Sequence, residues 1–263
     1  AKLRPFEVYC GLLNGGATCY MNATFQQLFM QPRLRKMLIC SPLEKNPEKV
    51  SDVFESLRGV FLQMSGGMGN LVDPSLFWRS FKDYDGNPVD VREHQDAYEF
   101  FTRLQDSLDE YSKSLGNEKV MYSVLGGSFI QIIEVPEHEG LRSEREEEFY
   151  QISVDVRGKK DLIESLESYV APETLYGENQ WHCEELGHKV DAKKKTMLKK
   201  LPDTLVFHLK RFEWDFETLS RWKIKDRFEF PQRIDMKPYV DQPNPGEDYM
   251  YNLSGVIVHS GTA

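Results

Sequence analysis

Apolar residues follow two different spacings in two parts of the chain, and this division constrains the fold more than any other feature. In the first 116 residues they recur three and four positions apart, which is typical of helices with one buried face. From about residue 120 onward, short runs rich in β-branched and aromatic residues alternate with charged or Gly/Pro-containing segments. Helices first and strands later predict an α+β fold rather than an alternating α/β fold.

The apolar spacing places three helices and a series of strands. The expected helices cover residues 17–31, ended by Pro32, then 48–65, and then 93–115 before a capping Gly116. Residues 134–148 are expected to form a solvated loop or a hairpin. The expected strands are Met121–Leu125, Ser128–Val135, Phe149–Val156, Tyr169–Val170, Thr204–Phe212 and Tyr251–His259.

Composition excludes several classes of protein and partner. The 263 residues carry 33 Lys+Arg and 42 Asp+Glu, and the net charge of −9 argues against nucleic acid or an anionic membrane as a partner. No apolar run reaches the length of a membrane span, and the first residues do not read as a secretory signal. The four cysteines form no C-x-x-C pair. We therefore expect an intracellular protein with reduced thiols, in the cytoplasm, the nucleus or both.

One cysteine stands where a helix is expected to begin. Cys19 follows Gly15-Gly16 and Thr18, a possible N-cap, at the start of the first expected helix. The positive end of the helix dipole favours a thiolate there, and a thiolate attacks carbonyl carbons. The N–H of Cys19 and the side-chain amide of Asn14 would then suit an oxyanion. The alternative from the residues alone is a small buried cysteine with a packing role.

Four stretches in order resemble one protein family. Gly11–Gln27, GLLNGGATCYMNATFQQ, resembles the Cys box of the ubiquitin-specific proteases, which are papain-like deubiquitinases. Glu93–Phe101, EHQDAYEFF, resembles the family's Q-Q-D-A-x-E-F helix, and Leu201–Phe212, LPDTLVFHLKRF, resembles its L-K-R-F strand. Tyr251–Gly261, YNLSGVIVHSG, resembles its H-x-G strand. The Cys box and DMKPY at Asp235–Tyr239 are most similar to the branch of very large members.

The resemblance implies a fold, an activity and a set of site residues. It implies a papain-like catalytic domain with a helical thumb at 1–116, β fingers at 117–200 and a partial palm at 201–263. It implies hydrolysis of the bond after the C-terminal glycine of ubiquitin, with ubiquitin and ubiquitinated proteins as partners. Cys19 matches the nucleophile and Asn14 the oxyanion-hole asparagine.

The second of these stretches implies the substrate contacts. Gln95, Asp96 and Glu99 match the helix that lines the cleft, where acidic groups would suit the arginines of the ubiquitin tail. Tyr20 and Tyr98 are candidates for the walls of the channel that holds the two terminal glycines. For both tyrosines the alternative is a packing residue whose hydroxyl has a hydrogen-bond partner.

The general base is the first departure from the family pattern. In the family, the base histidine lies in a G-H-Y motif several residues after the H-x-G strand, and its orienting residue comes later still. This sequence ends at Ala263, so we expect both groups to be missing and the fragment to be poorly active. By the resemblance, His259 is the strand histidine that precedes the base, with a structural or cleft-bordering role.

The zinc site of many family members is the second departure. The first cysteine pair is absent from Ile133–Arg145, and in the second, WHCEELGH, only Cys183 remains. Because a structural zinc needs four ligands, we expect no metal and no cofactor. Two other functions stay open: a non-catalytic ubiquitin-binding domain, and a protease for another ubiquitin-like modifier with the same Gly-Gly end.

Overall fold

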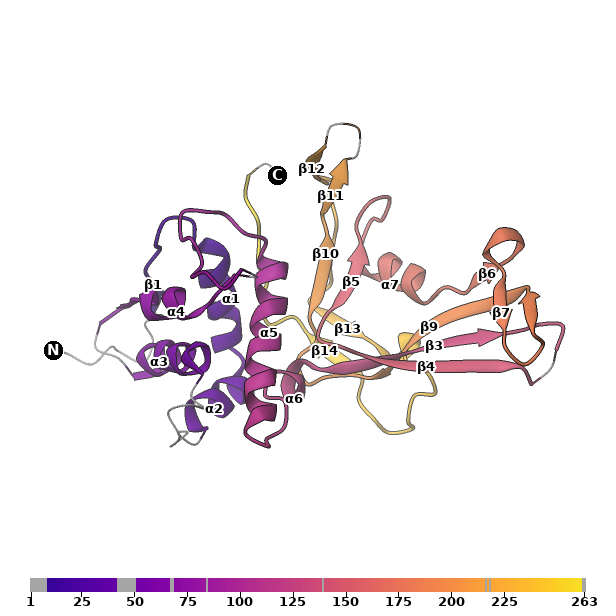
Figure 1. Ribbon diagram of the computed structural model, residues 1–263, viewed down its shortest axis with the longest axis horizontal. Coiled ribbons are helices and arrows are strands. Elements are labelled where there is room, and N and C mark those ends of the chain that lie inside the picture. Colours follow the sequence, from indigo (N-terminus) through magenta and orange to yellow (C-terminus); the bar gives the residue numbers. More distant parts are fainter. Residues whose placement is uncertain are drawn as a thin grey trace. The chain divides into compact units, whose positions relative to one another are not determined.

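The structure is a computed structural model of the chain, and it consists of two compact units (Figure 1). It describes residues 9–41, 51–66, 69–83, 85–138, 140–215, 217 and 219–261. One unit contains Ala1–Val124 with Gly255–Val258, and the other contains Leu125–Ser254 with His259–Ala263. The expected limits of thumb, fingers and palm, at residues 116 and 200, stay a prediction.

The first unit is helical, with one short pair of parallel strands. The strands are β1 (Gly11–Leu12) and β2 (Leu71–Val72). The helices are α1 (Cys19–Phe29), α2 (Pro32–Cys40), α3 (Asp52–Gly66), α4 (Ser75–Ser80) and α5 (Ala97–Ser114), with α6 (Tyr122–Leu125) at the boundary of the two units.

Aromatic rings from three helices form the core of the first unit. Phe100 of α5 is fully buried and meets Phe25 of α1 edge-on, with ring centroids 5.9 Å apart. It also meets Phe77 of α4 at 6.2 Å and Phe81, just after α4, at 5.2 Å. Edge-to-face pairs of this kind contribute about 0.5–1.5 kcal/mol each beyond their burial. They therefore hold α1, α4 and α5 together.

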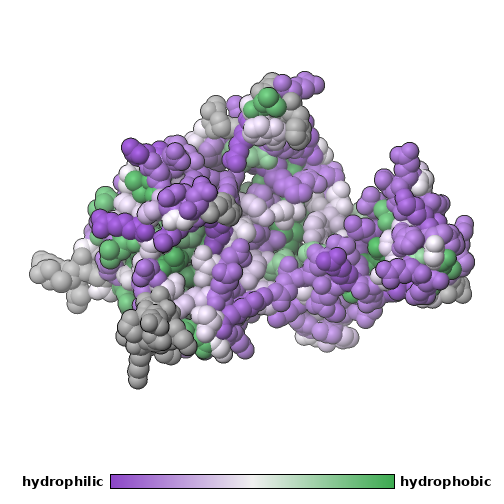
Figure 2. Space-filling model, viewed as in Figure 1, coloured by the Kyte–Doolittle hydropathy of each residue, from purple (hydrophilic) through white to green (hydrophobic). Residues whose placement is uncertain are grey.

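A four-stranded antiparallel sheet dominates the second unit. Its strand order is β4-β3-β9-β6, from β3 (Gly127–Glu134), β4 (Arg142–Phe149), β6 (Glu173–Leu175) and β9 (Ala192–Lys200). Five of the eight residues of the edge strand β4 are acidic or basic residues exposed to solvent. Charges on an edge strand discourage pairing with other chains. Figure 2 shows the surface over β4 and β9 as largely hydrophilic.

Shorter elements complete the second unit. β5 (Ile152–Asp155) pairs in parallel with β10 (Phe207–Lys210), and α7 (Leu162–Val170) packs over their apolar face. This packing buries Ile152, Val154 and Leu166 in one core. The remaining elements are β7 (Trp181–Cys183), β8 (His188–Val190), β11 (Phe212–Asp215), β12 (Ser220–Lys223), β13 (Arg233–Asp235), β14 (Met250–Asn252) and the 3-10 helices η2 (Gly177–Asn179) and η3 (Lys237–Tyr239).

The helical prediction for the first unit is confirmed in outline, with shifted ends. Pro32 ends α1 as expected, yet it also opens α2, because proline fits the first turn of a helix. The third predicted helix begins four residues late, at Ala97, because the Asp96 side chain caps it. The predicted stretch 48–50 lies outside the described residues.

Two predicted strands are wrong because both segments are helical. Met121–Leu125 forms a turn and α6, since the Asp109 carboxylate accepts the N–H groups of Met121 at 2.7 Å and Tyr122 at 3.1 Å. Tyr169–Val170 is the end of α7, which Asp161 caps through the Glu164 N–H. In both places a distant or preceding carboxylate satisfies the N–H groups at a helix start.

The other strand predictions hold in different degrees. Ser128–Val135 is confirmed as β3, and residues 134–148 form the hairpin end and β4. The expected strand Tyr251–His259 is mostly wrong, since only its first two residues lie in β14, which pairs with β13. No helix among the described residues is long and apolar enough to cross a membrane.

Two glycine substitutions should change stability in opposite directions. At Gly127 an added Cβ would lie 2.5 Å from the Lys200 carbonyl oxygen and from Phe149, so Gly127→Ala should destabilise the fold by about 1–3 kcal/mol. At Gly59, inside α3, a Cβ meets nothing within 4 Å, so Gly59→Ala should stabilise it by about 0.5–1 kcal/mol. Urea unfolding followed by circular dichroism measures both. Equal effects of the two variants would contradict the tight contact at Gly127 and the open space at Gly59.

Candidate active site

The loop from Leu13 to Thr18 joins β1 to α1 and is fixed by neighbouring backbone. The Leu13 N–H donates to the Val72 carbonyl at 2.9 Å, which extends the pairing of β1 with β2. The Ala17 N–H donates to the Val91 carbonyl at 2.6 Å. Gly16 adopts a φ of +137°, and a Cβ there would lie 3.0 Å from that same carbonyl oxygen. The loop therefore needs glycine at this position.

Asn14 organises the loop through its side-chain oxygen. Its Oδ1 accepts from the Gly16 N–H at 2.9 Å, the Thr18 N–H at 3.3 Å and the Thr18 hydroxyl at 3.0 Å. Because all three partners donate, the side-chain atom that accepts them must be the oxygen. The Nδ2 group is therefore on the other side of the amide. Nδ2 donates to no described residue, and Asn14 is exposed. The arrangement therefore leaves an N–H₂ donor free for a substrate.

Cys19 is the first residue of α1 and is exposed to solvent. Among the described residues, the N–H groups of Cys19 and Tyr20 have no acceptor. Thr18 occupies the N-cap position as expected, but its hydroxyl accepts from the Gly15 N–H at 3.0 Å instead of capping the helix. The first turn of α1 also lacks acidic residues. These open N–H groups at the helix start can donate to a bound acceptor group.

The expected substrate-binding residues of the second stretch gather at the start of α5. The Asp96 side chain accepts the Tyr98 N–H at 2.8 Å, so one of its oxygens caps the helix. Glu99 lies in the first turn and is exposed, and Gln95 and Tyr98 are half-buried. Glu99 is therefore the more accessible of the two carboxylates for a basic partner.

Tyr20 occupies a packing position. Its ring is 6% exposed and meets Phe100 edge-on at 5.3 Å. Its hydroxyl is buried and has no hydrogen-bond partner among the described residues. Burial raises the pKa of Tyr20 to about 12, and Arg103 opposes that shift. This position favours the packing alternative over a channel wall, although the expected hydroxyl partner is not there.

His259 lies in the second unit, where a lysine holds it. Lys223 Nζ donates to His259 Nδ1 at 2.9 Å and to the His259 carbonyl at 3.1 Å. Phe212 meets the imidazole edge-on at 5.2 Å. The lysine donor makes Nδ1 the acceptor nitrogen of the ring. The imidazole is thereby tied to β11 and β12.

The region of the expected zinc remnant is a short hairpin of β7 and β8. Cys183 is buried, whereas His182 and His188 are exposed, and His188 Nδ1 lies 2.8 Å from the Leu186 carbonyl. Within the described ranges, no group of three or more His, Cys, Asp or Glu residues could hold a metal ion.

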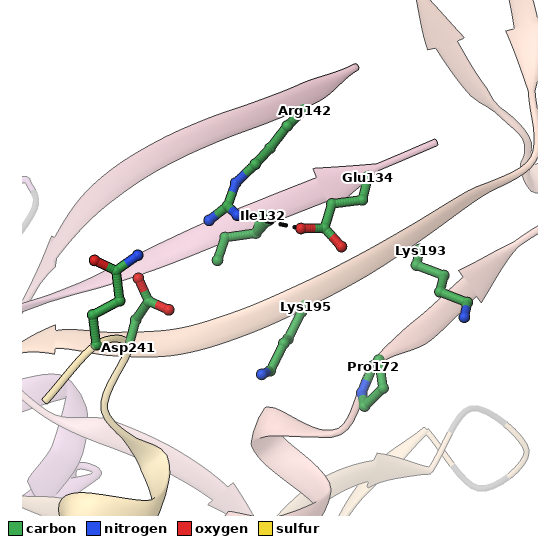
Figure 3. Close-up of a pocket in the computed structure, with 8 residues that line it drawn as sticks. Ile132, Glu134, Arg142, Pro172, Lys193, Lys195 and Asp241 are labelled. Atoms are coloured by element: carbon green, nitrogen blue, oxygen red, sulfur yellow. Dashed lines mark hydrogen bonds and ion pairs between the residues drawn. The ribbon is translucent and has the colours of Figure 1, made fainter. Parts of the chain in front are cut away.

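A hollow of about 230 Å³ in the second unit contains none of the predicted site residues (Figure 3). It lies against the face of β3, β4 and β9 that carries Ile132 and Lys195. On the wall of the hollow Arg142 points to Glu134, and Arg142 Nη1 lies 3.3 Å from Glu134 Oε1. Charges of both signs line it: Glu134, Arg142, Lys193, Lys195 and Asp241, with Ile132, Pro172 and Gln242.

Comparison with known proteins decides the family. A family model described as ubiquitin carboxyl-terminal hydrolase matches residues 10–263. The chain belongs to this family. It is 35% identical to mouse ubiquitin carboxyl-terminal hydrolase 9Y and 36% identical to human ubiquitin carboxyl-terminal hydrolase 24, in each case over 99% of this chain. The chain spans only 13% and 11% of the lengths of these two relatives.

A solved structure confirms the fold. The SAGA Ubp8/Sgf11/Sus1/Sgf73 DUB module bound to ubiquitin aldehyde matches with a TM-score of 0.79 and 25% identity. The match covers 97% of this chain and 59% of the other. The α+β, papain-like fold of the hydrolase family, expected from the sequence, is therefore confirmed, and so is the resemblance to its very large members.

Two residues that support the Leu13–Thr18 loop of this hydrolase domain could not be identified from the sequence. Val91 acts through its backbone carbonyl, which any residue possesses. Trp78 of α4 packs against Gly15, where a Cβ would lie 2.8 Å from the indole. The Gly15-Gly16 pair signals a close approach, but the sequence does not say what approaches.

Removing the Tyr20 hydroxyl should stabilise the first unit. A buried hydroxyl without a partner costs about 1–3 kcal/mol, so Tyr20→Phe should gain up to about that amount. The folded state also resists ionisation of Tyr20, since its pKa lies near 12 instead of 10. Stability therefore falls as the pH rises from 10 towards 12. Thermal unfolding at pH 7 and pH 11 should show a smaller alkaline loss in Tyr20→Phe, and an equal loss would contradict it.

Proposed function

We propose that the protein containing this chain is a cysteine-type deubiquitinase. It hydrolyses the isopeptide or peptide bond after the C-terminal glycine of ubiquitin. The observation that carries the proposal is the exposed Cys19 at the open N-terminus of α1, in a domain that matches the hydrolase family over residues 10–263. A nucleophile needs this access and this electropositive setting.

The loop supplies the groups that such a reaction needs. Cys19 Sγ attacks the carbonyl carbon of the terminal glycine, and the carbonyl oxygen becomes an oxyanion. Asn14 Nδ2 and the Cys19 N–H, both without acceptors among the described residues, would donate to this oxyanion. The amine then leaves, and water hydrolyses the thioester to release ubiquitin. The proton transfers fall to the family's base histidine, a role given to no described residue.

Ubiquitin and ubiquitinated proteins are the proposed partners. The solved relative bound to ubiquitin aldehyde supports ubiquitin as the ligand. Gln95, Asp96, Tyr98 and Glu99 lie at the start of α5 and would contact the basic ubiquitin tail. For His259 the proposal keeps a structural or cleft-bordering role, with the imidazole held by Lys223.

The proposal also covers location and other partners. All four cysteines are free thiols, which supports an intracellular, reducing compartment. The charge of −9 supports the expectation that neither nucleic acid nor an anionic membrane is a partner.

Ubiquitin carrying a C-terminal electrophile tests the proposed nucleophile. In the full-length protein that contains this chain, mass spectrometry should find one adduct, on Cys19, because the electrophile requires the nucleophile and the ubiquitin site together. Cys19→Ala should form none. Cys40→Ala is the matched control, because Cys40 is also exposed and its loss should leave the adduct intact.

The other outcomes separate the alternatives. Ubiquitin binding without an adduct would refute the proposed hydrolase activity and favour a non-catalytic ubiquitin-binding domain. An adduct with another Gly-Gly modifier but none with ubiquitin would favour the protease for that modifier.

Asn14 offers a test of the oxyanion site alone. Asn14→Asp keeps the oxygen that accepts the three loop donors but lacks the N–H₂ group. The adduct rate should fall at least about 100- to 1000-fold, because the change removes one oxyanion donor and adds a carboxylate that repels the oxyanion. The melting temperature should change little. Asn14→Ala loses both groups, so it should lower the rate and the melting temperature together, and a normal rate in either variant would refute the role.

A further inference from the structure

The indole of Trp78 stands directly behind the loop that carries the candidate nucleophile. A Cβ built on Gly15 would lie 2.8 Å from Cη2 and Cζ3 of the indole, and 3.3 Å from Cε3. Real Cβ atoms do not come this close to an aromatic ring, so the ring and the Gly15 backbone are in direct contact. Gly15 lies between Asn14, the proposed oxyanion donor, and the turn that leads to Cys19.

The helix that carries Trp78 cannot retreat from this contact. The neighbouring Phe77 is fully buried and meets Phe25 at 4.8 Å and Phe100 at 6.2 Å. The Trp78 N–H also donates to the Pro74 carbonyl at 3.2 Å in the first turn of α4. Since α4 is anchored in the core, the indole forms a rigid surface against which the loop rests.

The indole N–H does not account for a tryptophan at this position. The indole Nε1 is buried and has no hydrogen-bond partner among the described residues. Leaving such a donor unsatisfied destabilises a fold, and a phenylalanine would avoid that loss. The shape of the larger ring is then the property that the site uses.

We propose that Trp78 is a positioning residue for the reaction at Cys19. Gly15 and Trp78 form a matched pair, in which the large indole fits only because residue 15 has no side chain. The indole presses on Gly15 from one side while the Val91 carbonyl holds the Ala17 N–H. Together they fix the turn in which Asn14 Nδ2 and the Cys19 N–H remain free for the oxyanion. This inference rests on the proposed function for its catalytic part, and on packing alone for its structural part.

A size-exchange experiment tests the pair. Trp78→Ala empties the space behind the loop, and Gly15→Ala pushes the loop away from the indole. A displacement of about 1 Å costs about 100-fold in rate, so each single variant should slow the maximal adduct rate with electrophilic ubiquitin by about 10- to 100-fold. The ubiquitin concentration at half-maximal rate and the alkylation of Cys19 by iodoacetamide should stay near wild type.

The double variant Gly15→Ala/Trp78→Ala should recover part of the loss, because the new methyl group enters the vacated space. If the rate loss of the double variant equals the product of the two single-variant losses, the proposed interaction between Gly15 and Trp78 is refuted. Residues that do not interact give additive free energies. Trp78→Phe, which keeps a ring in the core, should fold normally and lie between wild type and Trp78→Ala. Trp222→Ala is the matched control, because Trp222 is exposed on β12 and should leave the rate unchanged.

Amide hydrogen exchange at Ala17 tests the structural part without ubiquitin. Trp78→Ala should raise the exchange rate of the Ala17 N–H, which is buried and bonded to Val91 in the wild type. Unchanged exchange would overturn the inference. If the wild type forms no adduct, the proposed function fails, whereas this exchange measurement still decides whether Trp78 fixes the loop.

Discussion

The edge-on packing of Phe100 against rings of α1 and α4 is the contact on which the candidate site depends. It holds the helix that begins with Cys19, the helix that carries Trp78 and the helix that begins beside Asp96. Because a fully buried aromatic core is close-packed, small shifts of one helix would move the others. The polar residues of the site therefore rest on an apolar arrangement to which they contribute little.

Within this frame, one side-chain oxygen organises the nucleophile loop. Asn14 Oδ1 accepts three donors, so the same amide group both shapes the turn and exposes its N–H₂. This double use explains why an asparagine suits the position better than a shorter or purely donating side chain. A serine could not accept three donors and still present one of its own at that distance.

Local signals predicted some elements well and failed where a partner distant in sequence decides. The spacing of apolar residues located α1, α3 and most of α5, and alternation located β3. It failed at Met121–Leu125, where Asp109 supplies the carboxylate that caps a turn twelve residues away. It also failed at Tyr251–His259, because the short strand β13 pairs only with Met250–Asn252.

The sequence by itself determined the family and the division into a helical first part and a β-rich second part, because these follow from ordered motifs and local spacing. By the same motifs it proposed Asn14 and Cys19 as site residues. Only the tertiary structure decided that Tyr20 packs inward, that Asp96 caps a helix and that Trp78 lies against Gly15. These three facts depend on contacts between segments far apart in the chain. Such contacts leave no local signal in the sequence. A glycine or a backbone carbonyl group has the same chemical identity whichever distant segment it contacts.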